Sequence, residues 1–206
     1  MRGARLVVLG LALALVAPAA GCGSSRVVNQ WSNPEYAAPH FNRIMVIGIT
    51  KQPSIRRTFE DEFVARLKEK GVDAVQSYLF LSEDGPVEEA RLNEGLRQAN
   101  VDATITTRLV KVEQKTEVRP GMYAPGPPYG FYRGYYGAWS GYYEPPTVYQ
   151  YDVYISETSL YDVTRSQLVW SGTVQTQQPG DIRKEIAQYV DVVIDALKDR
   201  HILAAR

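Results

Sequence analysis

The apolar pattern near the start of the chain predicts a buried strand followed by a helix. Residues 44–49 are almost continuously apolar, which is typical of a strand that is covered on both faces. Pro53 and Ser54 indicate the start of a helix, with Ser54 as its N-cap. Apolar residues then recur at every fourth position, so they share one side of this helix. Gly71 ends this helix. The apolar stripe consists of Ile55, Phe59, Phe63 and Leu67.

Three further elements complete the first half of the chain. The pattern predicts a strand at residues 72–80, a helix with Pro86 at its first position, and a long strand at residues 103–118. The apolar positions of the long strand change phase near Leu109. A change of phase inside a strand indicates a β-bulge, which we place at that residue.

The second half of the chain has the pattern of a hairpin and a last helix. Apolar and polar residues alternate at residues 149–155, a turn is predicted at residues 162–167, and residues 168–176 form the returning strand. Asp181 caps the final helix, and His201 falls in its last turn, where a cation suits the helix dipole. One face of this helix carries Ile182, Ile186, Tyr189, Val190, Val193 and Leu197.

This order of elements, β-α-β-α-β, an insert, then β-β-α, predicts an α/β fold with one mixed sheet and helices packed on it. We assign the domain to residues 43–206 and the insert to about residues 120–147. Residues 22–42 are mostly polar and are assigned to a tether. The apolar residues at positions 27–31 interrupt that tether, so we expect this part to dock on the domain, for instance as an edge strand.

The N-terminal residues resemble a bacterial lipoprotein signal peptide, which we assign to residues 1–21. Arg2 and Arg5 flank the start of an apolar run that is too short to span a bilayer. The small residues that follow end in Gly21 and Cys22 and resemble the lipoprotein cleavage box. This resemblance implies cleavage between Gly21 and Cys22 and acyl chains, such as palmitate, on Cys22. The alternative is an ordinary secretory peptide that leaves Cys22 as a free thiol.

Cys22 is the only cysteine of the chain, so the exported domain has to be stable without a disulfide. One acyl chain holds a protein to a membrane only weakly, whereas the three chains of a mature lipoprotein make its release negligible. Gly23 stands after the cysteine where an Asp marks retention at the inner membrane of enterobacteria. We therefore expect a lipid-anchored protein on the periplasmic face of the cell envelope, at the outer membrane.

The insert contains an aromatic segment, residues 123–146, that holds seven of the fourteen tyrosines together with five glycines and five prolines. Glycine and proline at this density prevent a regular element. Rings suit a protein interface, a glycan or the lipid headgroup layer, and a low-complexity loop without a partner stays an alternative. The candidate partner-binding residues are Tyr129, Phe131, Tyr132, Tyr135, Tyr136, Trp139, Tyr142 and Tyr143.

The sequence carries no recognisable catalytic, metal or cofactor motif. The two histidines, His40 and His201, have no ligand at metal-binding spacing. The acidic residues 60–62 lie among arginines at helical spacing, which favours a solvated, ion-paired helix face. Lys and Arg together number 23, as do Asp and Glu, and loss of the signal peptide removes two arginines, so no basic excess supports nucleic-acid binding.

Several short motifs resemble a group of uncharacterised bacterial lipoproteins. They are Trp31–Tyr36 (WSNPEY), Arg43–Ile49 (RIMVIGI), Arg56–Phe63 (RRTFEDEF), Ser159–Asp162 (SLYD) and Leu168–Gly172 (LVWSG). The element order is also similar to that of small envelope-assembly domains, namely the amino-terminal domain of TolB and the periplasmic domain of the curli secretion lipoprotein. The lipoprotein group has no assigned activity, so the resemblance to it implies none for this chain. The resemblance to the envelope-assembly domains concerns the order of elements alone.

We interpret the sequence as a non-enzymatic envelope lipoprotein, a scaffold or accessory subunit that binds a protein partner. The first alternative is a periplasmic module that binds a glycan or small ligand with the aromatic segment, and a third is an enzyme with an unrecognised site. An aromatic segment folded over a pocket favours the ligand-binding module, whereas an exposed segment favours the scaffold.

The lipid anchor predicts that Cys22→Ala abolishes acyl labelling and stops maturation, because the modification needs that thiol. The check is metabolic labelling with a fatty acid, followed by fractionation. A variant that still matures and partitions with membranes as the wild type does contradicts the lipoprotein interpretation.

Overall fold

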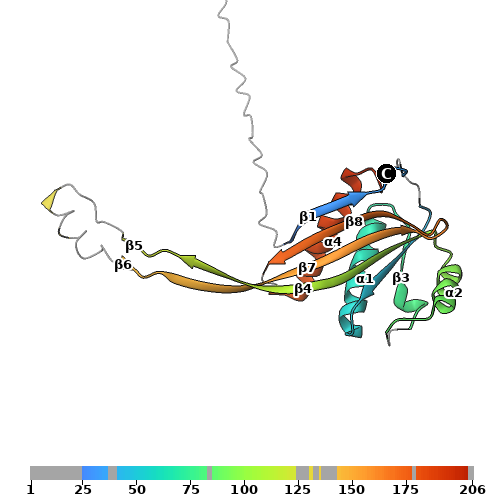
Figure 1. Ribbon diagram of the computed structural model, residues 1–206, viewed down its shortest axis with the longest axis horizontal. Helices are drawn as coiled ribbons and strands as arrows, with labels where there is room; N and C mark the ends of the chain where they lie inside the picture. Colours follow the sequence, from blue (N-terminus) through green and yellow to red (C-terminus); the bar gives the residue numbers. More distant parts are fainter. Residues whose placement is uncertain are drawn as a thin grey trace, which may run out of the picture.

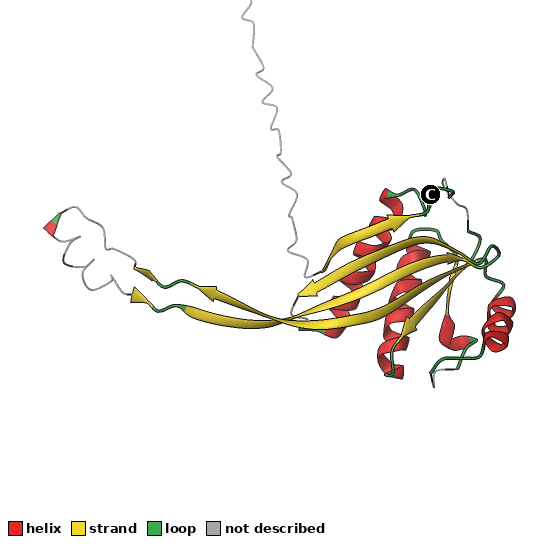
Figure 2. Cartoon of the chain, viewed as in Figure 1, coloured by secondary structure: helices red, strands yellow, loops and turns green. Residues whose placement is uncertain are grey.

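The chain folds into a twisted mixed sheet with helices on both faces (Figures 1 and 2). The computed structural model describes residues 25–36, 41–82, 85–123, 130–131, 135, 143–177 and 180–203. The strands are β1 (Ser25–Ser32), β2 (Ile44–Ile49), β3 (Ala74–Gln76), β4 (Ala103–Arg119), β5 (Met122–Tyr123), β6 (Tyr143–Glu144), β7 (Thr147–Asp162) and β8 (Gln167–Gln177). The helices are α1 (Pro53–Glu69), the short 3-10 helix η1 (Ser77–Leu79), α2 (Glu89–Ala99) and α4 (Ile182–Asp199).

Six strands form the main sheet in the order β1-β8-β7-β4-β2-β3, which confirms the predicted α/β class. β2 pairs in parallel with β3 and with β4, as the intervening helices require. β4, β7, β8 and β1 are antiparallel to one another in turn. The chain therefore joins a crossover half to a hairpin half through the pairing of β4 with β7.

Alternate residues of β2 enter two different cores. Ile44 and Val46 pack with α1 and α4, whereas Met45 packs on the other face with residues of β3 and α2. Trp170 is fully buried in the larger core, and its ring lies over Gly172, where any added Cβ would overlap it. Both faces of β2 are thus covered, as its continuous apolar run predicted.

Two predicted boundaries in the first half are wrong. Ser54 is not the N-cap of α1, because the helix begins at Pro53 with Gln52 at the cap position and no side-chain cap. The strand predicted at residues 72–80 ends at Gln76 and passes into η1. The hydroxyl of Ser77 is hydrogen-bonded to α1, so the chain leaves the sheet at this residue instead of continuing along it.

For α2 and α4, the predicted buried faces are more accurate than the predicted first and last residues. α2 begins at Glu89, not at Pro86, because Val87 packs against the smaller core before the helix starts. Asp181 caps α4 as predicted, accepting hydrogen bonds from the backbone N–H of Arg183 at 3.0 Å and of Lys184 at 3.4 Å. His201 lies beyond the last turn at a φ of 56°, so its predicted place inside the helix is wrong.

The hairpin of β4 and β7 extends well beyond the domain (Figure 1). Its register shifts between Leu109 and Lys111, which confirms the predicted bulge. β8 stops pairing with β7 at Val153, so Gln114–Arg119 and Thr147–Asp152 form a two-stranded ribbon, called the ribbon below. β5 and β6 pair with each other beyond its far end.

The segment expected to be a tether contributes the edge strand β1, which pairs with β8 from Ser25 to Ser32. Tyr36 fastens the chain after β1, because its hydroxyl donates to Asp162 at 3.1 Å and its ring lies under the guanidinium of Arg165. Burial alone would raise the pKa of Asp162, but hydrogen bonds from Thr164, Arg165 and Tyr36 lower it below its usual value. The carboxylate is thus held ionised where β7 ends.

The larger core predicts that Phe63→Ala destabilises the domain by about 3–5 kcal/mol, because Phe63 is fully buried and meets the ring of Phe59 edge-on. Chemical denaturation of the variant and the wild type measures this difference. Val118→Ala, on the exposed part of the ribbon, is the control and should cost less than about 0.5 kcal/mol. Superimposable curves for Phe63→Ala and the wild type would contradict the packing of α1.

Candidate functional site

A pocket of about 440 Å³ opens where α1 and α4 begin, between these helices and the sheet. Its volume lies within the range of about 300–1,000 Å³ that is usual for small-ligand sites. The lining is mainly apolar and includes Ile49, Ile55, Phe59, Leu109, Tyr154, Ile182, Ile186 and Tyr189. Thr107, Ser156 and Thr176 add hydroxyl groups from three neighbouring strands. The sequence did not predict this pocket, because its walls come from six separate elements.

A chain of hydroxyl groups joins Tyr189 of α4 to Thr107 of β4, and both of these residues line the pocket. The hydroxyl of Tyr189 lies 2.7 Å from that of Thr158, which in turn lies 2.7 Å from that of Thr107. Burial raises the pKa of Tyr189 to about 12, so the phenol stays neutral at physiological pH. These groups can orient a polar end of a ligand, and none of them is activated for proton transfer near pH 7.

Glu60 is completely buried beside the pocket, which contradicts the prediction of a solvated acidic face for residues 60–62. Its carboxylate accepts hydrogen bonds from Arg56 at 2.9 Å, Ser77 at 2.7 Å, the N–H of Gly48 at 2.9 Å and the N–H of Tyr78 at 3.1 Å. A buried charge requires such partners. Arg56, Glu60 and Val64 are spaced by four residues, so they form a second row on α1 next to the row of Phe59 and Phe63. This spacing is the feature of the sequence that could have predicted the burial of Glu60.

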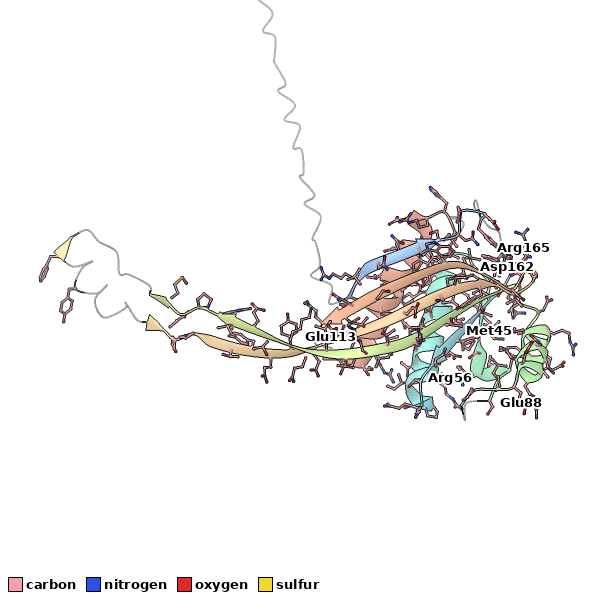
Figure 3. All side chains as sticks on the ribbon, in the orientation of Figure 1. Met45, Arg56, Glu88, Glu113, Asp162 and Arg165 are labelled. Atoms are coloured by element: carbon pink, nitrogen blue, oxygen red, sulfur yellow. The ribbon has the colours of Figure 1, made fainter. Side chains whose placement is uncertain are left out.

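Arg56 completes the buried cluster and links it to the chain after η1. Its guanidinium donates to the Ser77 hydroxyl at 2.7 Å and to the carbonyl of Ser82 at 3.0 Å, in addition to Glu60. Figure 3 shows Arg56 at α1 within the domain. The charges of Arg56 and Glu60 neutralise each other. We therefore interpret this ion pair as a structural feature that connects α1 to β2 and η1.

The two neighbouring acids do reach the surface. Asp61 accepts a hydrogen bond from the Tyr78 hydroxyl at 2.6 Å, and this bond together with partial burial raises the pKa of Tyr78 to about 12. Glu62 pairs with Arg66 at 2.9 Å, with both side chains about one-third exposed. The predicted solvated, ion-paired face is therefore correct for Glu62, whereas Glu60 is ion-paired as predicted but buried.

The other predicted site residues lie on the aromatic segment or near the N-terminus. Phe131 and Tyr135 are exposed, and Tyr143 pairs through its backbone with Tyr123 in β5 and β6. Gly21 and Cys22 lie outside the described residues, as do Tyr129, Tyr132, Tyr136, Trp139 and Tyr142. The paired ends of the segment lie at the far end of the ribbon, away from α1 and α4 (Figure 1), the two helices that line the pocket.

Over the residues that the structure describes, no group of three or more His, Cys, Asp or Glu side chains is placed to hold a metal ion. Within the same residues, no helix has the length and apolar character needed to cross a membrane.

Comparisons with known proteins give structural similarities only. No family model and no curated protein matches the sequence. The PelC dodecamer from Paraburkholderia phytofirmans is similar at 14% identity and a TM-score of 0.45, over 87% of this chain and 99% of that chain. Lipoprotein GNA1162 from Neisseria meningitidis is similar at 11% identity and a TM-score of 0.38, over 76% of this chain and 98% of that chain. At TM-scores below 0.5 these similarities carry no argument about function.

The buried cluster predicts that Glu60→Ala lowers the free energy of unfolding by about 3–5 kcal/mol, because it leaves the charge of Arg56 buried without its partner. The matched control is Glu62→Ala, which removes a partly exposed ion pair and should cost about 0–1 kcal/mol.

A double variant, Arg56→Met with Glu60→Leu, distinguishes the cost of an unpaired buried charge from the cost of replacing the side chain at position 60. It should be less destabilised than Glu60→Ala, since it removes both buried charges at once. Equal unfolding curves for Glu60→Ala and Glu62→Ala would show that Glu60 is accessible to solvent.

Proposed function

We propose that the protein is a non-enzymatic envelope lipoprotein that acts as a scaffold or accessory subunit and binds a protein partner through its aromatic segment. The observation that carries this proposal is that the pairing of β4 with β7 continues beyond its bulge out to Arg119 and Thr147. Because these two residues are direct partners, the segment between them is not required to close the sheet. The ribbon holds the ends of that segment away from the domain, where a second protein can reach it.

The chemistry of the segment supports a protein partner. Tyr, Trp and Phe are enriched at protein interfaces, since they bring a large contact area at a low cost in side-chain entropy. The described rings Phe131 and Tyr135 are 80% and 54% exposed. Arg119 stacks on Tyr149 at 4.8 Å, so cation and ring contacts stiffen the ribbon close to the segment.

The proposed location follows from the N-terminal residues. The cleavage box before Cys22 supports a lipid anchor, and Gly23 in place of Asp supports the outer membrane as the destination. A structure named as a lipoprotein is among the similar structures, but at a TM-score of 0.38 this similarity is not an argument for the location.

The pocket is the observation that favours a second function, the binding of a small ligand. It has the volume and apolar lining of a ligand site, with hydroxyl groups on one wall. The described ends of the aromatic segment pair at the far end of the ribbon and do not lie over the pocket (Figure 1). We therefore place the proposed partner contact on the segment.

The test joins Arg119 to Thr147 by an Asn-Gly turn, which removes residues 120–146. Asn-Gly favours the tight turn of a two-residue hairpin, and the pairing of the two flanking residues provides its ends. The melting temperature should move by only a few degrees, and proteins crosslinked to the wild-type chain in intact cells should be lost.

A second variant keeps the length of the segment, so that it separates the effect of the rings from the effect of shortening the chain. In it, serine replaces Phe131, Tyr132, Tyr135, Tyr136 and Trp139. It should lose the same crosslinks as the deletion. Loss of folding in the deletion would place the rings in the core. A folded deletion that keeps every crosslink would move the interface to the sheet or the helices.

A further inference from the structure

Three of the apolar residues that line the pocket are themselves exposed to solvent. Ile49, Leu109 and Ile182 are 57%, 52% and 51% exposed, and they come from the end of β2, the bulge of β4 and the first residue of α4. We call these three residues the apolar rim. The prediction that Ile182 belongs to the buried face of the last helix is corrected by this exposure. Three aliphatic side chains around one opening indicate a contact with an apolar phase.

Basic residues flank the apolar rim in the sequence. Lys51 follows Ile49 by two positions, and Arg183 and Lys184 follow Ile182 directly. All three are exposed, and over the described residues none of their side chains forms an ion pair. Asp181 caps α4 and Glu185 lines the pocket, so Lys51, Arg183 and Lys184 leave an excess of one positive charge (three basic against two acidic residues) beside the rim. Aliphatic side chains next to an excess of basic residues are the composition of surfaces that bind anionic lipid bilayers.

The start of β1 fixes where the anchor must be. Ser25 is the first residue of β1, and its hydroxyl lies 2.7 Å from that of Thr176, which lines the same pocket as the apolar rim. Cys22 precedes Ser25 by three residues, which span at most about 11 Å when fully extended. A lipid on Cys22 therefore keeps the bilayer surface close to this side of the domain.

We propose that the apolar rim is the surface on which the domain rests on the bilayer that holds Cys22. Ile49, Leu109 and Ile182 enter the boundary between headgroups and acyl chains, and the nearby basic residues meet anionic phosphates. The proposal rests on the lipid anchor of the proposed function. A short tether favours the contact, because it keeps the rim at a high effective concentration next to the membrane.

The contact also gives the pocket an orientation, since the same three residues line its opening. The pocket then opens toward lipid and not toward the periplasm. The ribbon begins a few residues beyond Leu109, so one surface fixes both the membrane side of the domain and the root of the ribbon.

The test places single fluorescent labels on the full, lipidated chain in vesicles of phosphatidylethanolamine and phosphatidylglycerol. Lipidation consumes Cys22, the only native cysteine, so a cysteine introduced by Leu109→Cys or Ile182→Cys is the only thiol that takes an NBD label. The control is Arg97→Cys, because α2 packs on the opposite face of the sheet and Arg97 is exposed there.

The labels at positions 109 and 182 should shift their emission to shorter wavelength in vesicles and lose intensity when the lipids carry nitroxide groups near the headgroup. The label at position 97 should do neither. An acylated chain in which all three labels respond as in water overturns the proposal and leaves the anchor in place. A chain whose intact mass shows no acyl groups, and whose Cys22 takes the label, overturns the anchor and the proposal together.

Discussion

The pairing of β4 with β7 is the interaction on which the rest of the structure depends. Its first part lies inside the sheet, where Ala103 and Ile105 enter the larger core and link the parallel strands to the antiparallel ones. Its second part continues as the ribbon, which among the described residues pairs with no third strand and belongs to neither core. An isolated two-stranded hairpin is marginally stable in water, so the ribbon depends on the sheet that it extends. Figure 3 shows Glu113 at the root of the ribbon, with Asp162 and Arg165 at the opposite end of the same sheet.

The domain thus separates the two proposed contacts, one with a protein partner and one with the membrane. At one place, the pocket and its apolar rim lie beside Ser25, close to the predicted anchor. At the other, the ribbon carries the paired ends of the aromatic segment away from the helices. The buried pair of Arg56 and Glu60 lies next to the pocket. Three hydrogen bonds to the Glu60 carboxylate, from Gly48 of β2 and from Ser77 and Tyr78 of η1, fix the helix that forms one wall.

The sequence predicted the features that depend on local patterning. The bulge at Leu109, the cap at Asp181 and the buried faces of Phe59, Phe63 and Leu67 follow from periodicity and from side-chain chemistry within a few residues. Features that depend on distant partners were missed. Glu60 is buried because Ser77 and Gly48 reach it from other elements, and residues 77–79 leave the sheet for the same reason. The residues that line the pocket come from six elements far apart in the sequence, so no motif marks it. The lipid anchor and the protein partner stay predictions.

The most direct test of the account is whether the ribbon exists in the register that places Arg119 opposite Thr147. Thr116 faces Gln150 in that register, at a separation that a disulfide can close, whereas Thr116 and Val148 are diagonal neighbours beyond about 7 Å. Because the mature chain offers no other thiol, oxidation of the Thr116→Cys, Gln150→Cys variant should give a crosslinked hairpin in high yield. The Thr116→Cys, Val148→Cys variant should stay reduced. Equal crosslinking of the two variants, or the reverse preference, would contradict a paired ribbon and the separation of the two contacts that follows from it.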